Sequence, residues 1–180
     1  FQMNSVQKKA WKRNQDLDIN IISTHQATDE HYKLYERYIN ERHADGDMFP
    51  PTQEQFEKFL VLSCTESIFI EFRLNEKLIA VSTCDQLDDG LSAVYTFFEP
   101  SESKRSLGTF AVLKQIEYAR NLDLAYVYLG YWVPHSNKMN YKSQFIPLDL
   151  LLDGQWRRLN RTLTNEEILQ LGNSLMTTLP

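Results

Sequence analysis

The first part of the chain predicts one strand followed by two helices. A β-branched run at residues 18–23 reads as a short strand. Thr28 then provides an N-cap for a helix that we expect to reach about Arg42. A glycine and paired prolines break that helix, and Thr52 opens a second helix over residues 53–62.

The middle of the chain predicts three strands in succession. Residues 67–73, 78–87 and 91–98 are rich in β-branched and aromatic side chains, and the links between them are short turns. Strands joined by short turns pair antiparallel. We therefore expect an antiparallel meander through residues 67–98.

The remaining pattern returns to helices and short extended pieces. Residues 109–121 carry apolar side chains at helical spacing directly after Gly108. A strand follows at 125–129, with a short helix expected near Lys138. The sequence further predicts extended pieces around 145–150 and 155–159, and a closing helix opened by a capping box of Thr164 and Glu167.

This order of elements indicates an α/β fold with a mixed sheet. It is the order typical of the N-acetyltransferase superfamily, in which the sheet splays open between its fourth and fifth strands. Free N–H groups at the following helix N-terminus favour an anion there. In this chain the corresponding loop, residues 104–109, holds two basic residues and a single glycine, fewer glycines than coenzyme A users carry.

Composition limits the organisation and the setting of the chain. Its 180 residues, of which 42% are hydrophobic, are enough for one core, so we expect one domain spanning 1–180. Cys64 and Cys84 lie far apart without a CxxC pair, which favours a reducing, cytoplasmic setting and argues against a metal site. No apolar run has the length of a membrane span or the character of a signal peptide. No cofactor or membrane partner is expected.

Local basic clusters stand out against the net charge of -5. One lies near the N-terminus, interleaved with aromatic residues, and another precedes the helix at 109–121. The alternative interpretation is a set of ordinary solvated faces. The predicted tRNA-binding residues are Lys8, Lys9, Lys12, Arg13, Lys104 and Arg105.

Three groups of motifs resemble the C-terminal catalytic region of the aminoacyl-tRNA protein transferases. These enzymes are the leucyl- and arginyl-transferases of the N-degron pathway. The resemblance extends over about residues 5–160. The motifs are YERY at 35–38 running into RHADGDM at 42–48, LGTFAVL at 107–113, and YLGYW at 128–132 continuing to KMNYKSQFIP at 138–147.

The resemblance implies transfer of an amino acid from aminoacyl-tRNA to the N-terminal residue of a protein. The bacterial branch, which transfers leucine to N-terminal Asp or Glu, is the more similar one. Family members also carry an N-terminal cysteine-containing region, which we expect to be absent from this chain. Two alternatives remain open: a coenzyme A dependent N-acetyltransferase, and a tRNA-binding or N-degron-binding module without catalysis.

Aminolysis of an ester requires positioning of the reactants and stabilisation of an oxyanion more than it requires a catalytic triad. An α-amine with a pKa of about 8 needs only a modest base. Backbone N–H groups near residues 95–98 are the oxyanion candidates. The predicted catalytic residues are His43, Asp45, Asp47 and Tyr141.

An acidic acceptor calls for cations, and an aminoacyl-adenosine group calls for aromatic walls. Lys138 and Lys142 lie four residues apart, which places them on one face of a helix. The predicted substrate-binding residues are Arg42, Lys138, Lys142, Tyr128, Tyr131 and Trp132. The structural alternatives are surface lysines, core aromatic residues, solvated loop aspartates and, for His43, a helix-end histidine facing the C-terminal dipole.

Overall fold

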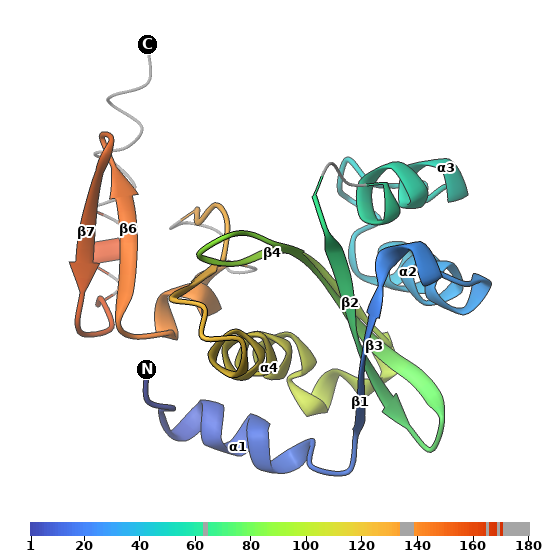
Figure 1. Cartoon of the computed structure of the whole chain (residues 1–180), viewed down its shortest axis with the longest axis horizontal. Helices are drawn as coiled ribbons and strands as arrows, with labels where there is room; N and C mark the ends of the chain where they lie inside the picture. Colours follow the sequence, from blue (N-terminus) through green and yellow to red (C-terminus); the bar gives the residue numbers. More distant parts are fainter. Residues whose placement is uncertain (63–64, 134–138, 165, 169, 171–180) are drawn as a thin grey trace. The chain divides into compact units, whose positions relative to one another are not determined.

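The computed structural model describes residues 1–62, 65–133, 139–164, 166–168 and 170. The chain forms two compact units. The larger unit, Ser5–Gly130, holds a five-stranded sheet between two layers of helices (Figure 1). The smaller unit, Phe1–Asn4 with Tyr131–Pro180, holds a two-stranded sheet. The predicted α/β class with a mixed sheet is confirmed, whereas a single functional domain stays a prediction.

The strands of the large sheet lie side by side in chain order. Each neighbouring pair from β1 to β4 is antiparallel, and β5 pairs with β4 in parallel. All five strands fall where the sequence predicted them, to within a few residues. Their bounds are β1 Asp18–Ser23, β2 Ser67–Leu74, β3 Lys77–Gln86, β4 Gly90–Phe98 and β5 Tyr126–Tyr128.

Alternation along β2 explains why the sheet has a core on each face. Ile68, Ile70 and Phe72 point into one cluster of buried apolar side chains, which includes Phe110 of helix α4 (Leu107–Asn121). Phe69, in between, points into a second cluster formed with helix α2 (Asp29–Arg42). Since successive side chains of a strand face opposite sides, one apolar strand supplies both cores.

Helix α1 (Ser5–Arg13) was not predicted from the sequence. It is short and polar, and of its side chains Gln7 and Ala10 are buried. Trp11 anchors it to helix α4, with its ring 5.7 Å from the ring of Phe110. A helix of this kind is held by tertiary contact rather than by its own periodicity, which is why the sequence pattern does not reveal it.

The second predicted helix changes type along its length. Thr52 caps α3 (Gln53–Phe56) by accepting a hydrogen bond from the backbone N–H of Gln55. The chain then continues as a π-helical segment, η2 (Glu57–Val61), where an α-helix was expected. A π-turn holds more residues than an α-turn, so it shifts which side chains face the sheet.

Helix α4 begins at Leu107, two residues before the predicted start. Ser106 precedes it with a φ of 57°, and this left-handed residue turns the chain out of the 3-10 segment η3 (Pro100–Arg105). Gly108 is therefore inside the helix. A side chain there would stand 4.0 Å from the ring of Phe98, so the glycine is not required for space.

Gly90, by contrast, is required where β4 and β5 meet. A Cβ atom at this position would lie 2.7 Å from the carbonyl oxygen of Tyr126 and 2.9 Å from the ring of Tyr128. Only a residue without a side chain permits this approach. The parallel pairing covers Gly90, Leu91 and Ser92 of β4, so most of this nine-residue strand extends beyond its partner.

The smaller unit is built on a hairpin. Strands β6 (Leu148–Leu152) and β7 (Gln155–Leu159) pair antiparallel, and Arg158 holds Asp149 through two hydrogen bonds of 2.8 Å each. The first strand begins at Leu148, later than predicted, and the 3-10 segment η4 (Asn140–Gln144) precedes it. The predicted capping box is confirmed, with Thr164 and Glu167 exchanging hydrogen bonds. The short helix expected near residue 138 lies outside the described residues.

Cys84 is a free, fully buried cysteine of β3, and burial raises the pKa of its thiol to about 12. It behaves as a small core residue, whereas Cys64 lies outside the described residues. Across the part of the chain that the structure describes, every helix is too short or too polar to cross a membrane.

Candidate functional site

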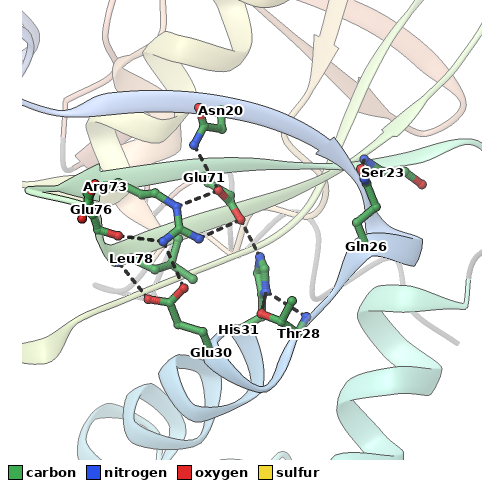
Figure 2. Close-up of polar contacts among 10 residues, drawn as sticks. All are labelled: Asn20, Ser23, Gln26, Thr28, Glu30, His31, Glu71, Arg73, Glu76 and Leu78. Atoms are coloured by element: carbon green, nitrogen blue, oxygen red, sulfur yellow. Dashed lines mark hydrogen bonds and ion pairs between the residues drawn. The ribbon is translucent and has the colours of Figure 1, made fainter.

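The N-terminal end of α2 is fixed to the sheet by a buried hydrogen-bond network (Figure 2). The Nδ1 atom of His31 accepts hydrogen bonds from the backbone N–H of Thr28 at 3.1 Å and from its hydroxyl at 2.9 Å. The proton of the neutral ring is therefore on Nε2, which donates to Glu71 on β2 at 2.9 Å. Burial lowers the pKa of His31 and outweighs the attraction of Glu71, so the ring is neutral.

Glu71 is the centre of this network. Arg73 donates to both carboxylate oxygens, at 2.9 and 3.2 Å, and Asn20 of β1 adds a bond of 3.4 Å (Figure 2). Burial opposes ionisation of Glu71, but these donors outweigh it and lower its pKa. Arg73 also reaches Glu30 of α2 at 3.0 Å. The network thereby ties β1, β2 and α2 together and fixes the direction of the helix.

The C-terminal end of α2 carries Arg42 and His43 to residues 95–98 of β4, which we call the outer half of this strand. The guanidinium carbon of Arg42 lies 5.3 Å from the ring centre of Phe98. The ring of Tyr38 lies 5.0 Å from His43 and 4.9 Å from Phe98. The structure thus brings these two predicted substrate and catalytic residues together, next to the β4 residues proposed as oxyanion donors.

The two predicted catalytic aspartates follow in the loop that leaves α2. The backbone N–H of Gly46 donates to the carbonyl of His43 at 3.0 Å, which turns the chain directly after the helix. Asp45 and Asp47 flank this glycine, and both are exposed. Their carboxylates therefore stand within a few residues of Arg42, on the same loop as His43.

The outer half of β4 has N–H groups that face away from β3. Glu99 donates its N–H to the carbonyl of Ile79 at 2.8 Å, which sets the alternation at this end of the ladder. In an antiparallel ladder the N–H groups of successive residues point to opposite sides, so those of Thr96 and Phe98 point toward the β5 side. Pairing with β5 covers only residues 90–92 of the described strand.

The predicted tRNA-binding residues lie on α1 and η3, and we call them the basic surface. Arg13 donates to the carbonyl of Lys104, and Asn14 donates to the carbonyl of Arg105 at 2.8 Å. Arg105 itself is committed to structure, since it holds Asp16 through hydrogen bonds of 2.9 and 3.0 Å. The exposed cations of this surface are Lys8, Lys9, Lys12, Arg13 and Lys104.

Tyr128 lies at the opposite end of β4 from Arg42. It pairs with Ser92, and its hydroxyl donates to Asp89 at 2.9 Å. Its place in the larger unit is thus the closed end of the sheet. The structure does not bring it to the rings of Phe98 and Tyr38.

The other predicted substrate residues belong to the smaller unit. Lys142 donates to the carbonyl of Tyr131 at 2.7 Å, and burial lowers the pKa of this lysine. Tyr131 is 92% exposed, so its ring is open to contact with a ligand. The indole N–H of Trp132 is buried and has no partner among the described residues. Tyr141 contacts Phe145, at 6.5 Å between ring centres, and Lys138 lies outside the described residues.

Two parts of this site were not predicted from the sequence. The first is the network centred on Glu71, which depends on contacts between elements distant along the chain. The second is Phe59, which η2 places 5.6 Å from the ring of Tyr95. Within the described ranges no group of three or more His, Cys, Asp or Glu side chains is arranged to hold a metal ion.

Comparison with known proteins identifies the family. Residues 30–152 match the family described as "Arginine-tRNA-protein transferase, C terminus". The whole chain is 73% identical to a protein of Acinetobacter baylyi and 72% identical to one of Acinetobacter baumannii, each named "Aspartate/glutamate leucyltransferase". A protein of the same name from Hahella chejuensis is 47% identical over 156 residues, which is 87% of this chain.

The chain spans 66% of the length of each of these three relatives. The family match covers most of the chain, and it includes the α2 end with Arg42 and His43, the outer half of β4 and the start of α4. The chain therefore belongs to the aminoacyl-tRNA protein transferase family, and it contains the region described as the arginine-tRNA-protein transferase C terminus.

Proposed function

We propose that this protein transfers leucine from Leu-tRNA to the N-terminal Asp or Glu of other proteins and so marks them for degradation. The observation that carries the proposal is 73% identity, along the whole chain, to a protein named for this activity. The site geometry supports it, because cationic, aromatic and backbone N–H groups gather at the outer half of β4.

The reaction is an aminolysis of an ester. The acceptor α-amine attacks the carbonyl carbon of the leucyl ester, and the bond to the terminal ribose oxygen then breaks. The new peptide bond retains the leucyl group, and the proton lost by the amine passes to the released ribose hydroxyl. Negative charge collects on the carbonyl oxygen in between, so a fixed N–H donor accelerates the step.

The backbone of β4 supplies suitable donors. The N–H groups of Thr96 and Phe98 face the side that β5 leaves unpaired. A substrate carbonyl on that side accepts a hydrogen bond that a neighbouring strand would otherwise accept. A splay of this kind is the feature of the N-acetyltransferase fold that accommodates an acyl group. The short β4–β5 pairing supports that fold assignment.

Arg42, His43, Asp45 and Asp47 serve the acceptor in this proposal. A cation next to the reacting carbonyl attracts an acidic N-terminal side chain, while a loop carboxylate holds the incoming amine and accepts its proton. Their shared position at the C-terminal end of α2 and in the loop after it supports the assignment, because the network at Glu71 orients that helix.

The basic surface on α1 and η3 binds the tRNA. Its cations lie beside the N-terminal end of α4, where free N–H groups add to the attraction for a phosphate. Lys104 contributes its carbonyl to the contact with Arg13, so the two basic segments are held as one surface. Arg105 has a positioning role, through Asp16 and Glu102.

A transfer assay tests the proposal directly. Labelled Leu-tRNA and Arg-tRNA are supplied with peptides that begin with Asp, Glu or Ala. We expect leucine on the Asp and Glu peptides. Transfer of neither amino acid, or acetylation of the same peptides by acetyl coenzyme A, would contradict it.

Neutralising the basic surface should weaken tRNA binding and flatten its salt dependence. Each phosphate contact contributes about 0.7 to 0.9 to the slope of log affinity against log salt, so losing several flattens it measurably. The variant replaces Lys8, Lys9, Lys12 and Lys104 with glutamine, and binding is measured over a salt series. Lys33→Gln with Lys58→Gln, on helices of the opposite layer, is the matched control. An unchanged slope in the fourfold variant would show that the surface does not contact tRNA.

A further inference from the structure

An aromatic wall, made of rings in mutual contact, lines the outer half of β4 and the facing helix α2. It consists of Phe59, Tyr95, Tyr38 and Phe98. The ring of Tyr95 lies 5.6 Å from Phe59 and 6.3 Å from Tyr38, and Tyr38 lies 4.9 Å from Phe98. Phe59 is 44% exposed, Tyr95 and Phe98 are half-buried, and Tyr38 is buried behind them. The wall therefore presents the rings of Phe59, Tyr95 and Phe98 outward.

The π-helical segment accounts for the exposed end of this wall. Phe56 and Leu60, on either side of Phe59, are buried in the core against α2 and the sheet. The wider π-turn leaves Phe59 outside that core and against Tyr95. Phe59 thereby adds exposed apolar surface to the half-buried rings of Tyr95 and Phe98, and a contiguous apolar patch of this kind is typical of a binding surface.

The wall is next to the N–H groups that hold the reacting carbonyl in the proposed function. Tyr95 precedes Thr96 in the strand, and Phe98 carries both a donor N–H and a ring of the wall. In the aminoacyl-tRNA, the α-carbon of the amino acid is bonded to that carbonyl carbon. Its side chain must therefore lie within reach of the residues beside these donors.

We infer that the aromatic wall selects the amino acid carried by the tRNA, and that it takes an uncharged, branched apolar side chain. This inference rests on the proposed function and adds the residues that set its donor specificity. The basic surface for tRNA lies in the α1 and α4 layer, so the ribose approaches from that side. The amino acid then extends toward the α2 side, where the wall stands.

The charge at the end of the wall favours leucine over arginine. Arg42 lies over the ring of Phe98, so a cationic side chain placed along the wall meets a like charge. Burial raises the pKa of the Tyr95 phenol, so this side chain stays neutral. The wall is thus apolar with a positive end, which excludes arginine and accepts leucine.

The test holds the tRNA constant and changes only the amino acid. One tRNA is acylated with leucine, alanine or arginine, and kcat/KM is measured with an Asp-initiated peptide for the wild type and for Phe59→Ala, Phe59→Asp and Tyr95→Phe. Phe59→Ala should lower the preference for leucine over alanine about tenfold. Phe59→Asp should shift the preference from leucine toward arginine. Tyr95→Phe keeps the aromatic ring of the wall, so it should keep the wild-type preference for leucine over alanine.

The possible results distinguish a failure of this inference from a failure of the proposed function. If a Phe59 variant loses transfer equally from all three aminoacyl-tRNAs and also has a lower Tm, Phe59 has a structural role only and the inference is wrong. A changed preference among acceptor peptides with the donor preference intact would also overturn it, because the wall would then contact the acceptor. A wild-type protein that transfers no leucine overturns both. The exposed position of Phe59 makes its variants compatible with folding.

Discussion

Replacing Glu71 with glutamine will lower the free energy of unfolding by about 3 kcal/mol, measured by chemical denaturation. The carboxylate side chain is 5% exposed and balances Arg73, whose side chain is 21% exposed. Glutamine keeps the shape but removes the charge, and Arg73 then loses its buried counter-ion. His31 also faces an amide in place of a carboxylate, so the anchor of α2 weakens at two points.

Glu30→Gln is the matched control, because it makes the same chemical change against the same arginine. The Glu30 side chain is 47% exposed, and exposed ion pairs contribute about 1 kcal/mol or less. The Glu71 variant should also lose transfer activity, since α2 carries Arg42 and His43 to β4. Equal losses of stability in the two variants would show that burial of the network does not matter.

The pH dependence of stability follows from the same network. The pKa of His31 is lowered in the folded protein, so below about pH 6.5 the unfolded chain binds more protons than the folded one. The lowered pKa of Glu71 acts in the same direction at more acidic pH. Both groups therefore contribute stability at neutral pH that is lost on acidification, and Glu71→Gln removes the second contribution.

The sequence predicted the sheet well because its strands carry their own signal. The alternation in β2 and the short turns around β3 are local, and local patterns determine which residues pair. The N-cap at Thr28 is local as well, and α2 begins where it predicts. Helix α1 was missed because its stability comes from Trp11 on Phe110, a contact between distant segments.

The site could be predicted only as a set of candidates. The motif around Arg42 and His43 indicated candidate residues at the end of α2, but their contact with Phe98 depends on how α2 crosses the sheet. That crossing is fixed by the bond from His31 to Glu71, between elements with unrelated sequence patterns. A change of helix type, such as the one that exposes Phe59, has no signature in hydrophobic periodicity.

Replacing Lys142 with methionine will reduce transfer to Asp-initiated peptides by roughly ten- to a hundredfold, because a charge-assisted contact to a carboxylate contributes about 1.5–3 kcal/mol. Burial lowers the pKa of this lysine, and an acceptor carboxylate beside it would favour the charged form again. Peptides that begin with Ala lack the carboxylate and should be affected much less. Lys138→Met is the parallel variant for the second predicted lysine.

A structural role for Lys142 predicts a different result. Its ammonium also donates to the carbonyl of Tyr131 at 2.7 Å, so methionine removes a local contact as well as a charge. Lys142→Arg keeps both the charge and a donor, and it should retain much of the preference for Asp over Ala. If the methionine variants of both lysines keep the wild-type preference, these residues do not recognise the acceptor. We would then assign that role to Arg42 and His43, because Arg42 lies over Phe98 of β4 and His43 lies against Tyr38.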